Sequence, residues 1–171
     1  EVTFPDDTNT DFTTQLNEAK NAGADMMFLP IYYTPASLML AQAKDMGYAP
    51  TFFGADGMDG ILTLDGFDPA LAEGLMLMTP FNATATDDRT VKFVEAYTAQ
   101  YGTETLNQFA ADGNDVIYAI YNACLATGIN GETSAADACA KLIEFFATYS
   151  FDGLTGSGMT WDAAGMISKV P

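Results

Sequence analysis

Short apolar runs and stretches of helical periodicity follow one another along the first half of the chain. Short continuous runs of apolar or β-branched residues are typical of strands that a parallel sheet buries on both faces. These runs are Glu1 to Phe4, Met26 to Pro30, Thr51 to Phe53 and Leu75 to Met78. The sequence therefore predicts four strands over residues 1–80.

Helices are predicted between these runs. Phe12, Leu16 and Ala19 form one apolar stripe at helical spacing, which ends at Gly23. A second helix is expected to carry Pro35 in its first turn and to end at Gly47, because proline suits a helix start and glycine the left-handed residue after a helix. One or two further helical turns are expected around Ile61 and Leu71, so the pattern is that of alternating strands and helices.

The second half of the chain predicts three consecutive helices with no strand between them. Their signals are Phe93, Tyr97 and Tyr101 at four-residue spacing, the run from Val116 to Leu125, and the run from Ala138 to Phe146 after a cap at Ser134. Extended structure is expected to resume at Phe151, with a turn over Ala163 to Gly165.

This order is unusual for one complete domain, because the three helices have no sheet of their own to cover. We expect the chain to leave one lobe between Pro80 and Asp87, to cover a second lobe whose strands lie elsewhere, and to return near Phe151. The sequence thus predicts an incomplete α/β fold with a doubly wound parallel sheet, part of a larger two-lobed protein. The alternative is a single α/β domain with an appended helical bundle.

Composition narrows the function classes. The 171 residues include 23 acidic and 6 basic ones, a formal charge of -17, which opposes binding to nucleic acid or anionic lipid surfaces. No apolar stretch approaches the roughly 20 residues that cross a bilayer. The chain shows no basic segment followed by an apolar one, so we expect any secretion signal to have been removed or to lie outside this sequence.

The chain has no histidine and only two cysteines, Cys124 and Cys139. Without histidine, a serine or cysteine nucleophile loses its most common general base and zinc its most common nitrogen ligand, so catalysis is disfavoured. A disulfide between the cysteines would contribute about 3 kcal/mol in the loop-entropy estimate. The alternative is two buried free thiols, and the sequence leaves both open.

Tyr32 and Asp56 are the candidate site residues. Each follows a predicted strand, and ligands of open parallel sheets bind outside the carboxyl ends of the strands, so both side chains are expected to project into one crevice. Tyr33 is expected to point away and to pack in the core. On the residues alone, a turn residue that bonds its own backbone is the favoured interpretation of Asp56. The nearby D-G-M-D-G segment lacks the later acidic ligand of a calcium loop and the lysine of a phosphate loop.

Several segments carry a family resemblance in their order along the chain. They are T-D-F-T-T-Q-L-N-E-A-K-N-A-G-A-D, I-Y-Y to G-A-D-G, A-E-G-L-M-L-M-T-P-F, V-K-F-V-E-A-Y-T-A-Q-Y-G and S-F-D-G-L-T-G. Together they resemble the second half of the branched-chain amino-acid receptors of ABC transporters, the type I periplasmic binding proteins. The resemblance implies a C-terminal fragment of two α/β lobes joined by three hinge strands. Residues 1–80 would belong to the second lobe, 81–150 to a hinge crossing and helices covering the first lobe, and 151–171 to the hinge return and truncated final strands.

The resemblance also implies roles for individual residues. Asp56 matches the acidic residue that receives the α-ammonium group of the ligand, and Tyr32 the tyrosine that lines the same pocket. Phe109 is expected near the cleft. The groups that hold the ligand carboxylate belong to the lobe that this chain lacks, so we expect weak or no ligand binding by these residues alone.

The implied function is an extracytoplasmic receptor, in the periplasm or at the cell surface as a lipoprotein, that binds a small amino acid or related amide and hands it to a membrane permease. No catalytic residue, metal or other cofactor is implied. A ligand-sensing domain of the same fold and a carboxylate-dependent α/β enzyme are the alternatives. The exposed sheet edge and hinge surface of the fragment are expected to favour self-association.

Overall fold

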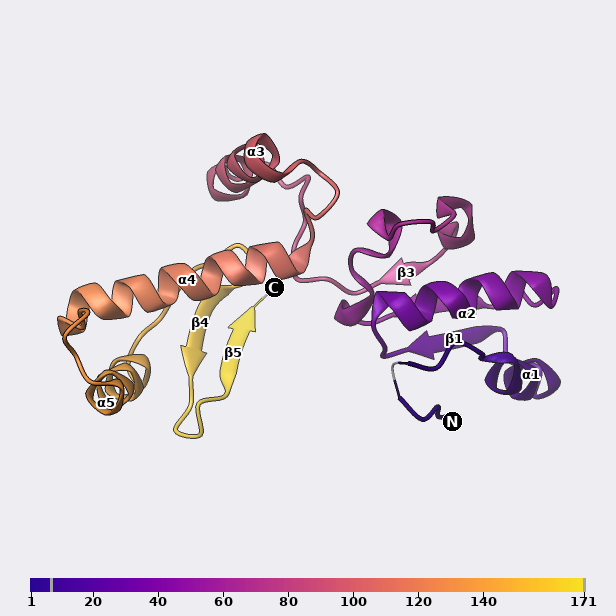
Figure 1. Cartoon of the computed structure of the whole chain (residues 1–171), viewed down its shortest axis with the longest axis horizontal. Helices are drawn as coiled ribbons and strands as arrows, with labels where there is room; N and C mark the ends of the chain where they lie inside the picture. Colours follow the sequence, from indigo (N-terminus) through magenta and orange to yellow (C-terminus); the bar gives the residue numbers. More distant parts are fainter. Residues whose placement is uncertain (7, 171) are drawn as a thin grey trace. The chain divides into compact units, whose positions relative to one another are not determined.

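The chain divides into two compact units, which are described separately. The computed structural model describes residues 1–6 and 8–170. The first unit is Glu1–Thr79 and the second is Pro80–Pro171 (Figure 1).

The first unit is built around a three-stranded parallel sheet in the order β1-β2-β3. Its elements are α1 (Thr13–Asn21), β1 (Met26–Leu29), α2 (Tyr33–Asp45), β2 (Thr51–Gly54) and β3 (Met76–Leu77). In the pairing register Leu29 lies opposite Gly54, and Gly54 opposite Leu77, so the three strands end at the same edge of the sheet. The α/β class and the parallel sheet expected from the sequence are confirmed.

One face of this sheet forms the core of the unit. Met27 and Leu29 of β1 join the buried side chains of α1 and α2 in a single cluster, together with Met58 and Ile61. The helix positions expected from the sequence are confirmed, with Phe12 and Leu16 fully buried and Gly23 and Gly47 in the left-handed conformation. Three short 3-10 helices connect β2 to β3: η1 (Asp56–Met58), η2 (Ile61–Thr63) and η3 (Pro69–Ala72). The expected helical turns around Ile61 and Leu71 are thus confirmed.

The other face of the sheet is bare within the first unit. Met26, Phe28, Met76 and Met78 are between 43% and 54% exposed, and the ring of Phe28 packs against that of Phe53, with 5.7 Å between centroids. The expectation that the apolar runs are buried on both faces is therefore wrong for this chain. The reason is that α1 and α2 both contribute to the core on the side of Met27 and Leu29.

Residues Glu1 to Phe4 do not form the predicted strand. A strand needs a neighbour that takes up its backbone hydrogen bonds, and the sheet of this unit pairs only β1, β2 and β3. The segment is instead held by side chains. Phe4 packs edge-on against Phe12 at 5.2 Å between ring centroids, and the Gln15 side-chain amide donates to the carbonyl of Thr3 at 2.8 Å.

The second unit contains the three consecutive helices that the sequence predicts, followed by an antiparallel strand pair. These elements are α3 (Asp88–Tyr101), α4 (Gln108–Thr127), α5 (Ala135–Phe146), β4 (Ser157–Trp161) and β5 (Ile167–Val170) (Figure 1). The predicted cap at Ser134 is confirmed, because its hydroxyl accepts from the Asp137 N–H at 3.1 Å. Asp87 caps α3 in the same way, and hydrogen bonds from Thr90, its backbone N–H first, hold the pKa of that carboxyl below its usual 3.8.

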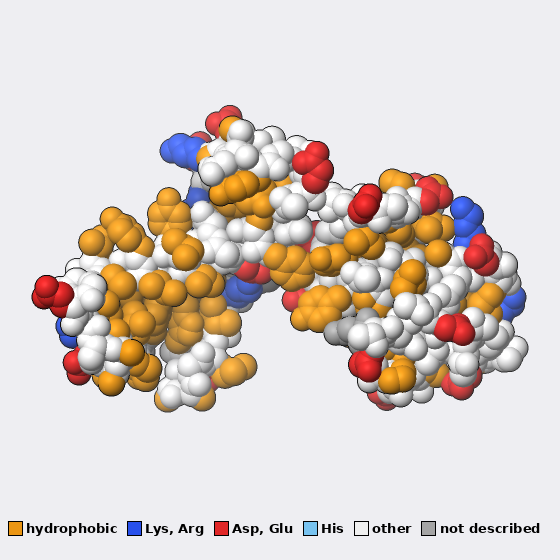
Figure 2. Space-filling view, viewed as in Figure 1, with side chains coloured by type: hydrophobic (Ala, Val, Ile, Leu, Met, Phe, Trp, Pro, Cys, Tyr) orange, Lys and Arg blue, Asp and Glu red, His pale blue; other side chains and the backbone are white. Residues whose placement is uncertain are grey.

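Helix α4 is largely apolar from Val116 to Leu125. Its buried side includes Ala111, Ala119 and Ala123. Its opposite side carries large apolar residues that are 41% to 67% exposed, namely Val116, Ile117, Ile120, Tyr121 and Leu125. Figure 2 shows hydrophobic side chains gathered over this unit. A helix of this kind is normally covered on every side, so the outward side of α4 is a second bare apolar face.

Both cysteines are free thiols. Cys124 on α4 is half-buried and Cys139 on α5 is exposed. The structure thus contains no disulfide between them, and the alternative of two buried thiols is wrong as well, because Cys139 lies on the solvent side of its helix.

Candidate ligand site at the carboxyl ends of the strands

Tyr32 lies at the junction between β1 and α2. It is the N-cap residue of α2, with extended backbone angles (φ -79°, ψ 162°), and its carbonyl accepts the first helical hydrogen bond from the Ala36 N–H at 3.1 Å. The side chain is 58% exposed. Tyr33, by contrast, is partly buried against the core, as the sequence predicts. Helix initiation therefore fixes the backbone of Tyr32 while its ring stays accessible.

Asp56 lies at the equivalent place after β2. The Ala55 N–H donates to the Leu29 carbonyl at 3.3 Å, so the two strands remain linked up to the residue before Asp56. Asp56 then begins η1, and its side chain is exposed.

Gly57 brings the two loops into contact. A Cβ atom on Gly57 would lie 3.0 Å from the Ile31 carbonyl oxygen and 3.3 Å from Cδ1 of Tyr32. The Tyr32 ring thus lies directly against the backbone of the residue that follows Asp56. A larger residue at position 57 would thus require the Ile31 carbonyl or the Tyr32 ring to move by a few tenths of an ångström. The role of Tyr32 and Asp56 in ligand binding stays a prediction.

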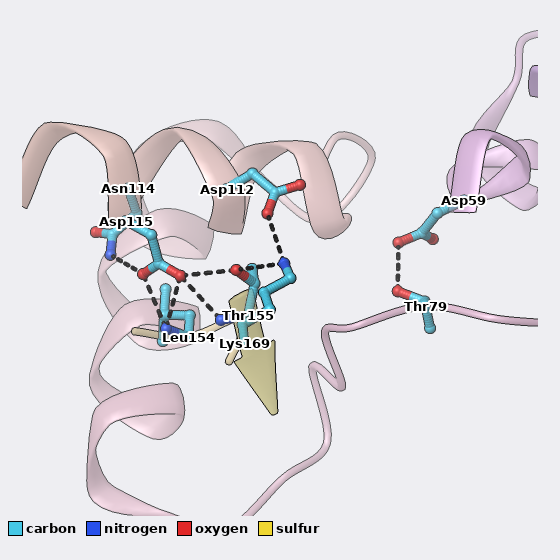
Figure 3. Close-up of polar contacts among 8 residues, drawn as sticks. All are labelled: Asp59, Thr79, Asp112, Asn114, Asp115, Leu154, Thr155 and Lys169. Carbon is cyan, nitrogen blue, oxygen red and sulfur yellow. Dashed lines mark hydrogen bonds and ion pairs between the residues drawn. The ribbon is translucent and has the colours of Figure 1, made fainter. Parts of the chain in front are cut away.

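A polar contact joins the end of β3 to the same region. The Thr79 hydroxyl donates to the Asp59 carboxylate at 3.2 Å (Figure 3). Asp59 closes the η1 turn that Asp56 begins. No local pattern indicates this pair, because the two residues are twenty positions apart. Its effect is to hold the loop after β2 to the last strand of the sheet.

The charge of the first unit suits a cationic group. Residues 1–79 contain twelve acidic and two basic residues.

Among residues 1–6 and 8–170, no group of three or more acidic or cysteine side chains is placed to hold a metal ion. None of the described helices is long and apolar enough to cross a membrane.

Phe109 lies in the second unit, at the second residue of α4, and is 40% exposed. Its N-cap neighbour Asn107 accepts from the Ala110 N–H at 3.2 Å, which fixes the start of the helix. Its place near a cleft stays a prediction.

A buried carboxylate that sequence reasoning missed organises the second unit. Asp115 on α4 is 6% exposed and accepts hydrogen bonds from the Leu154 N–H at 2.8 Å, and from the Thr155 N–H and hydroxyl at 2.9 Å each (Figure 3). Gly153 packs so closely that a Cβ atom there would overlap the Asp115 carboxylate. The Arg89 guanidinium donates to the Gly153 carbonyl at 2.7 Å, so α3 and α4 are both tied to this segment.

Comparison with known proteins places the fold. A family model described as periplasmic binding protein matches residues 1–170. A leucine binding protein from Thermotoga maritima is similar with a TM-score of 0.72 and 24% identity, over 98% of this chain and 45% of that one. The substrate binding protein of a branched-chain amino acid transporter from Streptococcus pneumoniae, in complex with isoleucine, is similar with a TM-score of 0.67 and 23% identity, over 92% and 42%.

A third similar structure has a different kind of ligand. It is a solute binding protein of an ABC transporter from Rhodopseudomonas palustris in complex with p-hydroxybenzoic acid, with a TM-score of 0.69 and 15% identity, over 95% of this chain and 44% of that one. A comparison with curated protein sequences found no match. The chain thus spans less than half the length of these solved structures, and the likeness confirms the fold class expected from the sequence.

Proposed function

The chain belongs to the periplasmic binding protein family, and from this premise we propose that it forms one part of an extracytoplasmic receptor that delivers a small amino acid to the permease of an ABC transporter. The family and the similar structures are substrate-binding proteins rather than enzymes. The proposed ligand is a branched-chain or similar small amino acid, or its amide.

The observation that supports this function is the close approach of the Tyr32 ring to Gly57, the residue after Asp56, at the ends of two adjacent parallel strands. In the proposed complex, Asp56 receives the α-ammonium group and Tyr32 packs on the ligand beside it. An ion pair at about 4 Å gains about 4 kcal/mol at an effective dielectric of 20. Because Asp56 is exposed in this chain, solvent screening reduces that gain to about 1 kcal/mol until an opposing lobe excludes water.

We assign residues 1–80 to one ligand-binding lobe, 81–150 to a hinge crossing and the helices of the other lobe, and 151–171 to the hinge return. Two features support this assignment. The sheet of the first unit is bare on one face, and α4 in the second unit is bare on its outward side. Both are surfaces that α/β proteins normally bury, and polypeptide beyond this chain would cover them.

A ligand without an ammonium group is the second candidate. The likeness to a protein bound to p-hydroxybenzoic acid favours it, because that molecule offers a carboxylate and no cation. Asp56 would then repel the ligand rather than pair with it, so the charge of Asp56 separates the two candidates.

The decisive experiment is calorimetry with leucine, isoleucine and p-hydroxybenzoate on a longer polypeptide that carries both lobes. For an amino-acid receptor we expect Asp56→Asn to weaken leucine or isoleucine binding at least tenfold. Asp65→Asn removes another exposed carboxylate from the same unit and should leave the affinity unchanged. Unchanged affinity for an amino acid in the Asp56→Asn variant would refute the proposed ion pair. Tighter binding of p-hydroxybenzoate in that variant would favour the second candidate.

A further inference from the structure

The second unit contains a cavity of about 360 Å³ that the proposed strand-end site does not involve. It lies between α3, α4 and the segment from Phe151 to Leu154, so all of its lining belongs to the second unit. Cavities of this size suit small organic ligands.

Two cations line this cavity from one side of α3. Arg89 and Lys92 are three residues apart, which places them on the same side of the helix. The bond from Arg89 to the Gly153 carbonyl fixes the guanidinium and leaves further N–H groups to donate. Lys92 makes no hydrogen bond or ion pair with the part of the chain that the structure describes. The lining carries these two basic residues and two acidic ones, Asp115 and Asp152, in a part of the chain, residues 80–171, that has eleven acidic and only four basic residues.

The carboxylates of the cavity wall are directed to other donors. Asp115 accepts hydrogen bonds from the backbone N–H groups of Leu154 and Thr155 (Figure 3), and Asp152 accepts one from the Gly158 N–H at 2.7 Å. Neither forms an ion pair with Arg89 or Lys92. The two cations therefore keep donors for an outside anion.

The remaining wall includes three aromatic residues. They are Phe93, Tyr118 and Phe151; Ala96 and Leu154 add apolar groups, and Asn114 adds one polar amide. Rings of this kind pack well on a flat apolar body, whereas a bare inorganic anion would leave them unused.

We propose that this cavity is a second binding site, which takes a small organic carboxylate with a flat apolar body. Arg89 and Lys92 bind the carboxylate, because guanidinium and ammonium groups form charge-assisted hydrogen bonds with it. The aromatic rings hold the body. The charge preference is opposite to that of the strand-end site, whose carboxylate selects a cation.

The test is a titration of the ¹⁵N-labelled chain with benzoate, followed by amide chemical shifts. We expect saturable shifts at residues 89–96, 114–118 and 151–154, with millimolar affinity. Lys92→Gln and the double variant Arg89→Gln/Lys92→Gln should weaken binding, the double variant at least tenfold. The matched control Lys44→Gln/Lys141→Gln removes the same charge elsewhere and should bind like the parent chain. Benzylamine, which has the same ring and the opposite charge, should cause no such shifts.

Absence of saturable shifts, or equal affinity in the parent and both cavity variants, would overturn the proposal. Lys92→Gln leaves the Arg89 bond to Gly153 in place, so its effect does not depend on that tether. Asp56→Asn should leave benzoate binding at this cavity unchanged. Shifts confined to residues 30–33 and 55–58 would instead place benzoate at the strand-end site, which would refute the second site and leave the proposed receptor function standing.

Discussion

Replacement of Asp115 tests how the second unit is held together. Asp115→Asn keeps the shape of the side chain but exchanges one carboxylate oxygen for an NH₂ group, which would face donors rather than accept from them. Three close donors depend on this carboxylate, namely the N–H groups of Leu154 and Thr155 and the Thr155 hydroxyl, and the Asn114 side-chain amide donates to it at 3.4 Å. Hydrogen bonds to a charged group contribute about 1.5–3 kcal/mol, and an unsatisfied buried donor costs about 1–3 kcal/mol.

We therefore expect Asp115→Asn to lower the free energy of unfolding of the second unit by about 3 kcal/mol. The hydroxyl can rotate and the amide keeps one oxygen, so the full sum of three bonds is not lost. A loss of this size is a large part of the 5–15 kcal/mol that is typical of a folded domain.

The assay is urea unfolding followed by the fluorescence of Trp161. This is the only tryptophan of the chain, and it lies in β4 beside Phe146 and Tyr149, so its signal reports the second unit. Asp112→Asn is the matched control. The Asp112 side chain is 42% exposed and 3.9 Å from Lys169, and its loss should cost less than about 1 kcal/mol. Equal midpoints for the two variants would refute the view that Asp115 anchors the segment.

Two further predictions concern helix capping and the bare faces. Because the pKa of Asp87 is lowered in the folded chain, its stabilising effect is present above the usual value of 3.8 and is lost as the pH falls through the folded pKa. In thermal unfolding, Asp87→Ala should have a lower unfolding temperature than the parent at pH 6 and the same one in strong acid. Asp87→Asn should unfold close to the parent at pH 6. A difference between Asp87→Ala and the parent that persists in acid would contradict this. The bare faces predict concentration-dependent self-association in sedimentation velocity. Ile117→Glu, on the outward side of α4, should shift the chain toward the monomer, and Leu62→Glu should not; a parent chain that stays monomeric at all concentrations would be evidence against association.

The sequence predicts the helices well because their signals are local. Caps, glycine terminators and apolar spacing all lie within one or two turns, as for Ser134 and Gly47. The prediction of a strand from Glu1 to Phe4 is wrong because a strand forms only with a partner, and the residues of one segment do not reveal whether a partner pairs with it. The same reason explains why Met26 and Phe28 are exposed although their run reads as fully buried.

In the candidate site, too, local patterns predict the positions of single residues but not the contacts between distant ones. The positions of Tyr32 and Asp56 after two adjacent strands follow from local patterns and the rule for parallel sheets. The contacts of Asp59 with Thr79 and of Asp115 with Thr155 join residues 20 and 40 positions apart, so no local pattern indicates them. Nothing in the sequence distinguished Asp115 from the many solvated carboxylates of this acidic chain.

Gly153 carries a consequence for how this protein can evolve. Its backbone has no left-handed angle, so it is glycine for lack of room rather than for conformational freedom. A methyl group there would overlap the Asp115 carboxylate and approach Cε of Met159 to 2.5 Å. A lineage that replaces this glycine must first make room at both positions 115 and 159. Substitutions at these three positions are therefore contingent on one another, and the order in which they arise decides which of them is tolerated.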